Sequence, residues 1–401
     1  MKKLTLRDLS LADKRLFVRV DFNVPLRGGK VENDSRLRAS LPSLAYALEQ
    51  GARVILASHL GRPDGTRNEK YSLLSVAGYL QQLVGPAFVG FAADCVGSAA
   101  EDAVRLLRPG QAVLLENLRF HPGEEKNDRG FSEKLAALAD LYVNDAFGAA
   151  HRAHASTVGV VQVLGRGAAG FLMEKEIDYL SRAMERPEKP ATAIIGGAKV
   201  SDKIEIIENF LNIVQAILIG GGMAYTFLKC QGRPTGRSLV EEDKVEVAAR
   251  LLRQAESRGV QILLPVDHRV APELKADAPS RIVSRIPDDM IGLDIGPATI
   301  ASFCEAIGRS RTVIWNGPMG VFEMSAFSAG TLAVARAVAD ADGLTIVGGG
   351  DSVAALALAG VQDRIDHVST GGGASLEFLA GKKLPGVEVL TDAAAGTGGP
   401  G

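Results

Sequence analysis

The alternation of short apolar runs with helix-period segments constrains this chain more than any other feature. β-branched apolar runs recur from end to end, and each is followed by a glycine-rich or polar turn and then by an amphipathic stretch. The runs cover residues 16–22, 53–58, 112–115, 141–143, 192–195, 216–219, 261–264, 312–315 and 344–347. Strands that alternate with helices favour parallel sheets joined by right-handed crossovers. At 401 residues the chain is too long for one core, so the sequence predicts an α/β protein with two lobes.

The apolar runs end differently in the two halves of the chain. In the first half they lead into polar or charged residues, as in VDFN, SHLGR, ENLR and ND, whereas in the second half they lead into glycines, as in IGG, IGGG, VGGG and TGGG. Ligands of parallel α/β folds gather at the carboxyl ends of strands. We therefore expect side chains of the first half to bind a small anion, and backbone of the second half to approach a larger phosphate ligand. The charged, helix-periodic segment 171–185 is the expected boundary.

The first half carries its cationic side chains at expected strand ends or helix starts. These are Arg19, Arg36, His59, Arg62, Arg119, His151, Arg152 and His154. Arginine presents a planar fork of donors that matches carboxylate or phosphate oxygens in pairs, so several together would bind a multiply charged anion. The alternative is that each is ordinary surface charge, which fits Arg62 and Arg152 least because both lie beside small or rigid residues.

Two further choices in the first half stay open or unsupported. Asp21 and Asn23 lie two apart on a strand and share a face, so they either contact a substrate hydroxyl or close a turn before Pro25. The histidines have no cysteine cluster or HExxH motif beside them, which argues against a zinc site.

The second half has glycine-rich turns but neither a GxxxxGK[ST] loop nor a GxGxxG that opens a helix. Residues 196–203 (GGAKVSDK) place Lys199 and Lys203 four apart, on one helical face if the helix starts this early. Glycines let backbone approach phosphate and lysines add positive charge, although the glycines could simply form a tight turn. In GGGDS, Asp351 or Ser352 could cap the next helix, and Asp351 could hold Mg²⁺.

Several function classes are disfavoured by composition and motifs. The formal net charge of −2 gives no global sign of nucleic-acid or membrane binding. Cys95, Cys230 and Cys304 form no CxxC pair, and the first residues do not read as a signal peptide, so we expect a cytoplasmic protein. No activated-nucleophile motif is present, and phosphoryl transfer needs none. A dinucleotide-dependent dehydrogenase lacks its fingerprint here, and a non-catalytic anion-binding protein would not need Lys199, Lys203 and Asp351.

The ordered motifs resemble those of the phosphoglycerate kinase family. They are RVDFNVP, DSRLRAS, SHLGRP, ENLRF, GEEKND, NDAFGAAHRAHAST, GGAKVSDKI, GGGMAYTFL, LDIGP, WNGPMGVFE, VGGGDS and STGGGASLEFL, and they cover nearly the whole chain. The resemblance implies two similarly sized lobes, each a Rossmann-like three-layer α/β/α domain with a parallel sheet, joined by a hinge helix. It implies reversible phosphoryl transfer from 1,3-bisphosphoglycerate to MgADP, giving 3-phosphoglycerate and MgATP, in a monomer.

The resemblance also implies a division of the chain. Residues 1–170 would bind 3-phosphoglycerate or 1,3-bisphosphoglycerate, 171–185 would be the interdomain helix, and 186–375 would bind ADP or ATP with Mg²⁺. Residues 376–401 would return to the N-terminal lobe and end in a flexible tail.

Site residues follow from the matching motifs and remain implications of the resemblance. Asp21 and Asn23 would contact the glycerate, and the other substrate-binding residues would be Arg36, His59, Leu60, Gly61, Arg62, Arg119 and Arg152. The nucleotide-binding residues would be Gly196, Lys199, Lys203, Gly220, Gly221, Gly292, Asn316, Pro318, Val321, Glu323, Gly349, Gly350, Asp351 and Ser352. The catalytic residues would be Arg36, Lys199, Gly371 and Gly372, and Asp351 would serve the metal.

Two segments depart from the family pattern. Residues 232–238 read GRPTGRS, and residues 268–276 read HRVAPELKA with Leu274 where an aromatic residue often stands. Both are expected near the adenine, so the packing around the base is the least certain part of the expected site.

Overall fold

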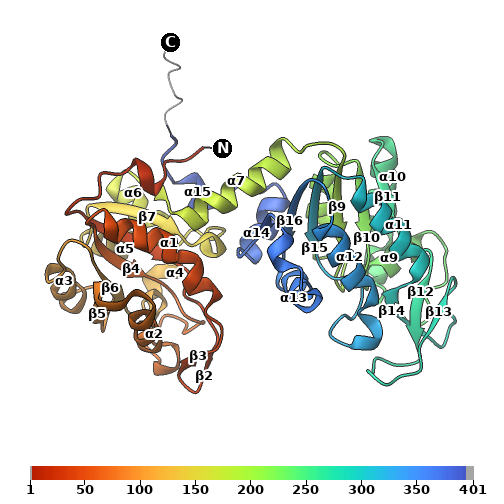
Figure 1. Cartoon of the computed structure of the whole chain (residues 1–401), viewed down its shortest axis with the longest axis horizontal. Helices are drawn as coiled ribbons and strands as arrows, with labels where there is room; N and C mark the ends of the chain where they lie inside the picture. The colour runs from red at the N-terminus through yellow and green to blue at the C-terminus, as the bar shows by residue number, and fades with distance from the viewer. Residues whose placement is uncertain (1, 394–401) are drawn as a thin grey trace, which may run out of the picture. The chain divides into compact units, whose positions relative to one another are not determined.

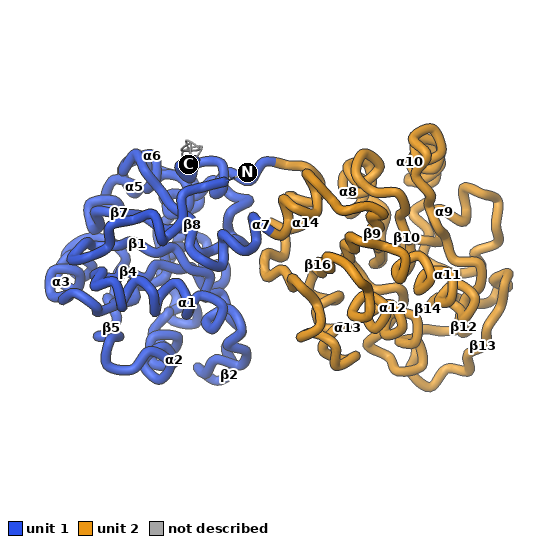
Figure 2. The backbone as a smooth tube through the Cα atoms, turned by 45° about the horizontal axis from the view of Figure 1, so that its top comes forward, with its two compact units in different colours: residues 1–178, 383–401 blue, residues 179–382 orange. Residues whose placement is uncertain are grey.

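The computed structural model describes residues 2–393 and divides into two compact units (Figures 1 and 2). Unit 1 comprises the chain up to Asp178 together with the segment from Lys383 onward, and unit 2 comprises Tyr179–Lys382. Each unit is built around its own six-stranded sheet. The α/β class predicted from the sequence is confirmed.

The sheet of unit 1 is parallel throughout. Its strands lie in the order β5 (Phe88–Ala92), β6 (Gln111–Leu115), β4 (Arg53–Ala57), β1 (Arg15–Val20), β7 (Leu141–Asp145) and β8 (Ala168–Ala169). The helices are α1 (Ser35–Glu49), α2 (Leu74–Val84), α3 (Ser98–Arg105), α4 (Pro122–Glu125), α5 (Arg129–Ala136), α6 (Val160–Leu164) and the first part of α7 (Phe171–Glu185). Alternate residues of β1, β4 and β6 pack with α1 and α2 in one apolar cluster.

The register of this sheet brings its carboxyl ends together. Val20 at the end of β1 pairs with Asp145 at the end of β7, and Arg19 pairs with Ala57 at the end of β4. The polar segments that follow these strands therefore start from one edge, as the sequence predicts.

The sheet of unit 2 is also parallel. Its order is β11 (Gln261–Leu263), β10 (Ala216–Ile219), β9 (Ala191–Ile195), β15 (Thr312–Asn316), β16 (Leu344–Gly348) and β17 (His367–Val368). The helices are α8 (Ile204–Phe210), α9 (Met223–Cys230), α10 (Val245–Ser257), α11 (Pro297–Gly308), α12 (Ala329–Ala339), α13 (Gly350–Ala359) and α14 (Gly373–Leu379). Successive residues of β9 (Ala193, Ile194 and Ile195) are all buried. Because neighbouring strand residues point to opposite faces, both faces of the sheet are covered.

The sequence did not predict several smaller elements. Unit 2 adds an antiparallel sheet of β13 (Arg281–Val283), β12 (His268–Ala271) and β14 (Ile291–Ile295). Unit 1 adds the hairpin β2 (Leu26–Arg27) and β3 (Lys30–Val31), and the short helix α15 (Pro385–Glu388).

The chain passes from unit 1 to unit 2 within α7, whose bounds coincide with the segment predicted as the boundary helix. It re-enters unit 1 at Lys383, later than the expected residue 376, because α14 packs against α8 in unit 2. The returning segment is fixed to the N-terminus: the backbone N–H of Leu4 donates to the Thr391 carbonyl (2.8 Å), and Lys3 Nζ to the Leu390 carbonyl (3.0 Å). Residues 394–401, which include the expected tail, lie outside the described residues. Within the described range no helix has both the length and the hydropathy of a membrane span.

Candidate active site

The candidate site residues of unit 1 begin where β1 ends. The side chain of Arg36, in the first turn of α1, donates through Nη1 to Asp21 Oδ2 (3.0 Å) and to the Asn23 carbonyl (3.1 Å). Asn23 in turn accepts the backbone N–H of Gly61 on Oδ1 (2.9 Å). Asp21 and Asn23 therefore do more than close a turn, because they join Arg36 and the segment after β4 into one structure. The guanidinium of Arg36 remains about a third exposed, at 37%.

Arg119 approaches the same segment from the end of β6. Its Nη1 donates to the Gly61 carbonyl (2.8 Å), and its Nε lies 3.1 Å from Glu125 Oε1. The side chain is only 7% exposed, and burial lowers the pKa of Arg119. Asn117 holds the Leu60 backbone on both sides, donating to its carbonyl (2.7 Å) and accepting its N–H (3.2 Å). Arg119 is therefore a pre-positioned cation beside a fixed backbone turn.

Positive charges converge on His59, which follows β4. Burial lowers the pKa of His59 well below its usual value, and the charges of Arg19, Arg119, Arg36 and His154 act in the same direction. Arg152 lies close enough to Arg119 to lower the pKa of that guanidinium further. The structure thus brings together the predicted Arg36, His59, Arg119 and Arg152. Arg62 is exposed.

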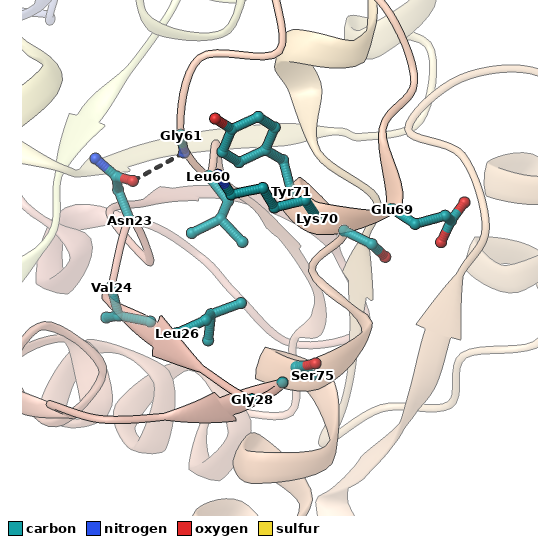
Figure 3. Close-up of a pocket in the computed structure, with 12 residues that line it drawn as sticks. Asn23, Val24, Leu26, Gly28, Leu60, Gly61, Glu69, Lys70, Tyr71 and Ser75 are labelled. Carbon is teal, nitrogen blue, oxygen red and sulfur yellow. Dashed lines mark hydrogen bonds between the residues drawn. The ribbon is translucent and has the colours of Figure 1, made fainter.

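A cavity of about 440 Å³ lies beside this cluster (Figure 3). Its wall includes the predicted residues Asn23, Leu60 and Gly61, with Tyr71 and Lys70 on the segment that precedes α2. Figure 3 shows the Asn23 amide oxygen directed at the Gly61 N–H. The arginines do not line this cavity, so the predicted anion-binding groups lie outside it.

The candidate site of unit 2 is formed by backbone at neighbouring strand ends. Ile219, Ile195, Asn316 and Gly348 pair across β10, β9, β15 and β16, so the glycine-rich turns after these strands start side by side. Gly371 and Gly372 follow β17, the next strand in the sheet. The predicted clustering of these turns at one edge is what the register requires.

Gly196 and Gly221 allow the turns to approach each other closely. A Cβ on Gly196 would lie 2.0 Å from the Pro318 carbonyl oxygen, and one on Gly221 would lie 2.6 Å from the Gly197 carbonyl oxygen. Gly221 also has a φ of +69°, which side-chain-bearing residues rarely adopt. The Gly197 N–H donates to Pro318 (3.1 Å), and the Gly221 N–H donates to Met319 (2.9 Å). Only glycine fits at these two positions.

Lys203 and Lys199 do not share a helical face. Helix α8 begins at Ile204, and the Lys203 N–H donates instead to the Val200 carbonyl (2.8 Å) in a preceding turn. The expectation that the helix starts early enough to align the lysines is therefore wrong. Lys203 Nζ donates to Asn316 Oδ1, and burial lowers the pKa of Lys203. Lys199 is exposed.

The turn after β16 places Asp351 and Ser352 in the first turn of α13. The N-cap is Gly349, and neither side chain caps the helix, which corrects that expectation. Ser352 is fully buried, and its Oγ accepts the Gly317 N–H (2.7 Å). Asp351 is exposed and lies near enough to Lys203 to oppose the lowering of the lysine pKa. Asp202, which is also exposed, opposes it more strongly, so two carboxylates lie near the lysine and Asp351 is the one on the glycine turn.

The remaining predicted nucleotide residues lie around the antiparallel sheet and the β15 turn. The N–H of Gly292 in β14 donates to Ser238 Oγ (2.9 Å), and the Val321 N–H donates to the adjacent Leu293 carbonyl (2.9 Å). Glu323 is exposed two residues later. Gly292 and Val321 are therefore neighbours, although they are far apart in the sequence.

Comparison with known proteins agrees with this arrangement. The sequence profile described as "Phosphoglycerate kinase" matches residues 6–382. Proteins named phosphoglycerate kinase from Moorella thermoacetica and Acidobacterium capsulatum are 59% identical over 394 residues and 56% identical over 403 residues. Each match covers 98% of this chain and 100% of the relative. The chain belongs to the phosphoglycerate kinase family.

Solved structures of phosphoglycerate kinases have the same fold. The structure from Coxiella burnetii superposes with a TM-score of 0.91 at 42% identity, covering 96% of this chain and 98% of that one. The structure from Pyrococcus horikoshii gives a TM-score of 0.80 at 33% identity with the same coverage. The predicted family membership and α/β fold are thereby confirmed.

The donor set at the unit 2 edge fits the magnesium that phosphoglycerate kinases use with nucleotides. Mg²⁺ commonly takes one or two carboxylates and fills its other positions with phosphate oxygens and water. Asp351 offers such a carboxylate, and Asn316 offers an amide oxygen that already accepts from Lys203. These residues could hold the ion only together with the phosphates of a bound nucleotide.

The sequence did not predict two residues that hold parts of the site in place. Asn117 and Glu124 carry no ligand role in the motifs, yet Asn117 fixes the Leu60 turn and Glu124 accepts from Ser156 (2.6 Å). Their position after β6, within the motifs ENLRF and GEEKND, was the one sign in the sequence that they belong to the site.

In the departing segment 268–276, Leu274 is about half exposed, at 52%.

Proposed function

We propose that the two units divide the reaction of the phosphoglycerate kinase family, with the glycerate on unit 1 and the magnesium nucleotide on unit 2. The contrast between the two strand-end edges carries this proposal: fixed guanidinium groups at one, and closely packed backbone turns at the other. A guanidinium recognises carboxylate and phosphate oxygens in pairs. Backbone N–H groups at glycine-rich turns suit the phosphates of a nucleotide.

In this reaction a phosphoryl group leaves the carboxyl oxygen of 1,3-bisphosphoglycerate and bonds to a terminal phosphate oxygen of ADP. The products are 3-phosphoglycerate and ATP, and the reverse reaction exchanges the same bonds. The transition state spreads negative charge over the three equatorial oxygens, so catalysis rests on positioning and on cations. No protein nucleophile or covalent intermediate is required.

We propose Arg36 and Lys199 as the cations that stabilise the transferring group. Arg36 is anchored by Asp21 and by the Asn23 carbonyl, yet remains partly exposed, so its remaining donors are available to an anion. Lys199 is exposed between the Gly197 turn and α8, and its side chain is free to move toward the phosphates. The N–H groups of Gly371 and Gly372 would add uncharged donors at the same phosphoryl group.

The other proposed contacts follow the same division. His59, Arg62, Arg119 and Arg152 would bind the phosphate and carboxylate of the glycerate. Lys203 would bind nucleotide phosphates, and Gly292, Val321 and Glu323 would contact the adenine and ribose. Mg²⁺, held by Asp351 and the phosphates, would neutralise charge on the nucleotide.

A coupled assay for ATP-dependent phosphorylation of 3-phosphoglycerate tests the activity directly. We expect turnover that requires 3-phosphoglycerate, ATP and Mg²⁺, and that stops when Mg²⁺ is chelated. Calorimetry of each ligand alone then tests the division. Arg119→Met should weaken 3-phosphoglycerate binding and leave nucleotide binding unchanged, and Lys203→Met should do the reverse. Loss of both ligands in either variant would refute the division between units.

A phosphoryl group passes directly only between ligands in contact, so we propose that the units close when both ligands bind. Small-angle scattering should show a smaller radius of gyration with both ligands than with either alone, and unchanged dimensions would count against closure. We further propose that the enzyme is a cytoplasmic monomer. Light scattering should give the mass of one chain, 42.2 kDa.

A further inference from the structure

The side chain of His59 makes one hydrogen bond within the described residues, and its partner is an arginine. Nδ1 of His59 lies 3.1 Å from Nη2 of Arg19, on the neighbouring strand β1. Both side chains are buried, with Arg19 at 0% and His59 at 6% exposure. The bond connects a proposed substrate-binding residue to a group that has no role in the proposed reaction.

The chemistry of arginine decides which way this bond runs. A guanidinium carries only donors, so Arg19 donates and His59 Nδ1 must accept. An imidazole whose Nδ1 accepts is not the imidazolium, and its proton is on Nε2. His59 is therefore neutral, and its only N–H is directed away from Arg19.

We propose that Arg19 is a positioning residue that fixes His59 as the neutral Nε2–H tautomer, so that His59 meets the anionic substrate as an uncharged donor at any physiological pH. The inference rests on the proposed role of His59 in glycerate binding and adds to it the protonation state and the residue that sets it. Arg19 itself stays buried behind the imidazole.

Arg19 is held in place by two further hydrogen bonds from its guanidinium besides the one to His59. Nε donates to Ser156 Oγ (2.8 Å), and Nη1 donates to the Val20 carbonyl. Because Ser156 Oγ accepts from Arg19, its own proton goes to Glu124 Oε1 (2.6 Å), while the Ser156 N–H donates to Glu124 Oε2 (3.0 Å). Both oxygens of Glu124 accept, so this fully buried carboxylate is the counter-charge of Arg19. Ser156 lies in the π-helical turn Ala155–Gly159, a geometry frequent at functional sites.

Burial and the positive charges around His59 disfavour protonation of its ring. The cations that face it are Arg19 from β1, Arg36 from α1 and Arg119 from the turn after β6. His154, before the π-helical turn, also faces it, but burial lowers the pKa of His154 to about 3, so that ring is neutral too. Each of these charges and the burial of the ring lower the pKa of His59. The buried carboxylate Glu124 is engaged by Ser156 and lies 3.9 Å from His154 Nδ1. No acid in the described residues pairs with the His59 ring.

This arrangement has a consequence for substrate binding. A histidine that bound the anion as a cation would lose its charge as pH rises through about 6.5. A histidine locked as a neutral donor keeps the same hydrogen bond across that range. The fixed charge of the site then comes from the arginines alone.

Nitrogen-15 NMR of the whole protein labelled at histidine tests the inference without a substitution. The His59 ring signals, assigned by their loss in His59→Gln, should show a bare Nδ1 and a protonated Nε2 from about pH 5 to 8. A proton on Nδ1, or titration near 6.5, would overturn the inference. In Arg19→Met the ring should begin to titrate in that range or change tautomer. The control Arg15→Met, on the same strand but in an exposed pair with Asp140, should leave the His59 signals unchanged.

Kinetics separate this inference from the proposed function. Arg19→Met and His59→Gln should each raise KM for 3-phosphoglycerate about tenfold, with KM for ATP unchanged, and the double variant should lose little more than either alone. Additive losses would contradict action through His59. If His59→Gln leaves KM unchanged while the NMR result holds, the substrate role of His59 is wrong and the tautomer assignment stands. If Arg19→Met does not fold, the wild-type spectrum still decides the tautomer.

Discussion

The two units present different kinds of donor at the carboxyl edge of a parallel sheet, where we propose that each binds anionic oxygens. In unit 1 the donors are side chains held by other side chains, as Asp21 holds Arg36 and Arg19 holds His59. In unit 2 the turns are packed backbone to backbone, as Gly196 lies against Pro318 and Gly221 against Gly197. One substitution can remove a single donor from a site made of side chains. In a site made of packed backbone turns, a substitution that moves one turn also moves the turns packed against it.

The largest expected effect is that of Arg36→Ala in unit 1. This change removes a cation that would stabilise the transferring phosphoryl group, and such losses typically cost about 10²–10³-fold in kcat. Steady-state kinetics should show this fall with an unchanged unfolding transition, because Arg36 is partly exposed and its loss removes little packing. The matched control is Arg38→Ala in the same helix, where the arginine pairs with Asp34. Near-normal turnover of Arg36→Ala would remove Arg36 from the mechanism.

Lys203→Met tests a half-buried cation at the unit 2 edge. Lys203 is held beside the turns by its hydrogen bond to Asn316. The proposed hydrogen bond from its charged amine to a nucleotide phosphate would contribute about 1.5–3 kcal/mol, so nucleotide affinity should fall about 10- to 100-fold. Calorimetric titration with ADP measures the change, and 3-phosphoglycerate binding should not move. Lys244→Met, at a half-buried lysine paired with the exposed Asp243, is the control. Equal losses in both lysine variants would point to a general charge effect.

Gly196→Ala asks whether the backbone edge tolerates a single methyl group. Its Cβ would lie 2.0 Å from the Pro318 carbonyl oxygen, so one turn must shift, at a cost of about 1–3 kcal/mol. We expect a lower Tm and roughly tenfold weaker ADP binding. Gly308→Ala at the end of α11 has open space around its Cβ and should change neither. Unaltered nucleotide binding in Gly196→Ala would show that the close approach is not needed for the ligand.

The sequence predicts those parts of both units that a local pattern determines. The main strands and the bounds of α7 were predictable because local apolar periodicity sets them. The edge at which ligand residues gather was predictable too, since parallel strands align their carboxyl ends. The short antiparallel strands β12, β13 and β14 were not, because their burial is partial and gives a weak pattern.

The supporting residues of the site were beyond prediction for a different reason. Asn117 bonds to Leu60 and Ser156 bonds to Glu124, contacts that join distant parts of the chain and leave no local signal. The spacing of Lys199 and Lys203 would put both on one helical face if the helix started early enough. Instead a turn runs from Val200 to Lys203, and the helix begins at Ile204. Propensity and spacing do not reveal such a turn, whose geometry is set by tertiary contacts.

The smallest expected effect concerns Asp145, at the end of β7, where unit 1 buries a carboxyl group without a cation. Burial raises the pKa of Asp145 from 3.8 to about 6, against the opposing N–H donation from Leu172 (2.9 Å) to its Oδ1. Between about pH 4 and 6 the unfolded chain therefore releases this proton before the folded chain does. The folded state consequently loses stability as pH rises through that window.

Asp145→Asn removes the ionisation and keeps an oxygen for Leu172. The free energy of unfolding of the variant, minus that of wild type, should rise by about 1–3 kcal/mol between pH 4 and pH 7. Urea unfolding, followed for unit 1, measures this difference. Asp140→Asn is the control of opposite sign, because hydrogen bonds from Arg15 lower the pKa of Asp140, and its loss should destabilise at neutral pH. A pH-independent difference for Asp145→Asn would mean that the folded carboxyl is already ionised. Unit 1 would then hold this negative charge with backbone N–H groups, the kind of donor that we propose for the phosphates in unit 2.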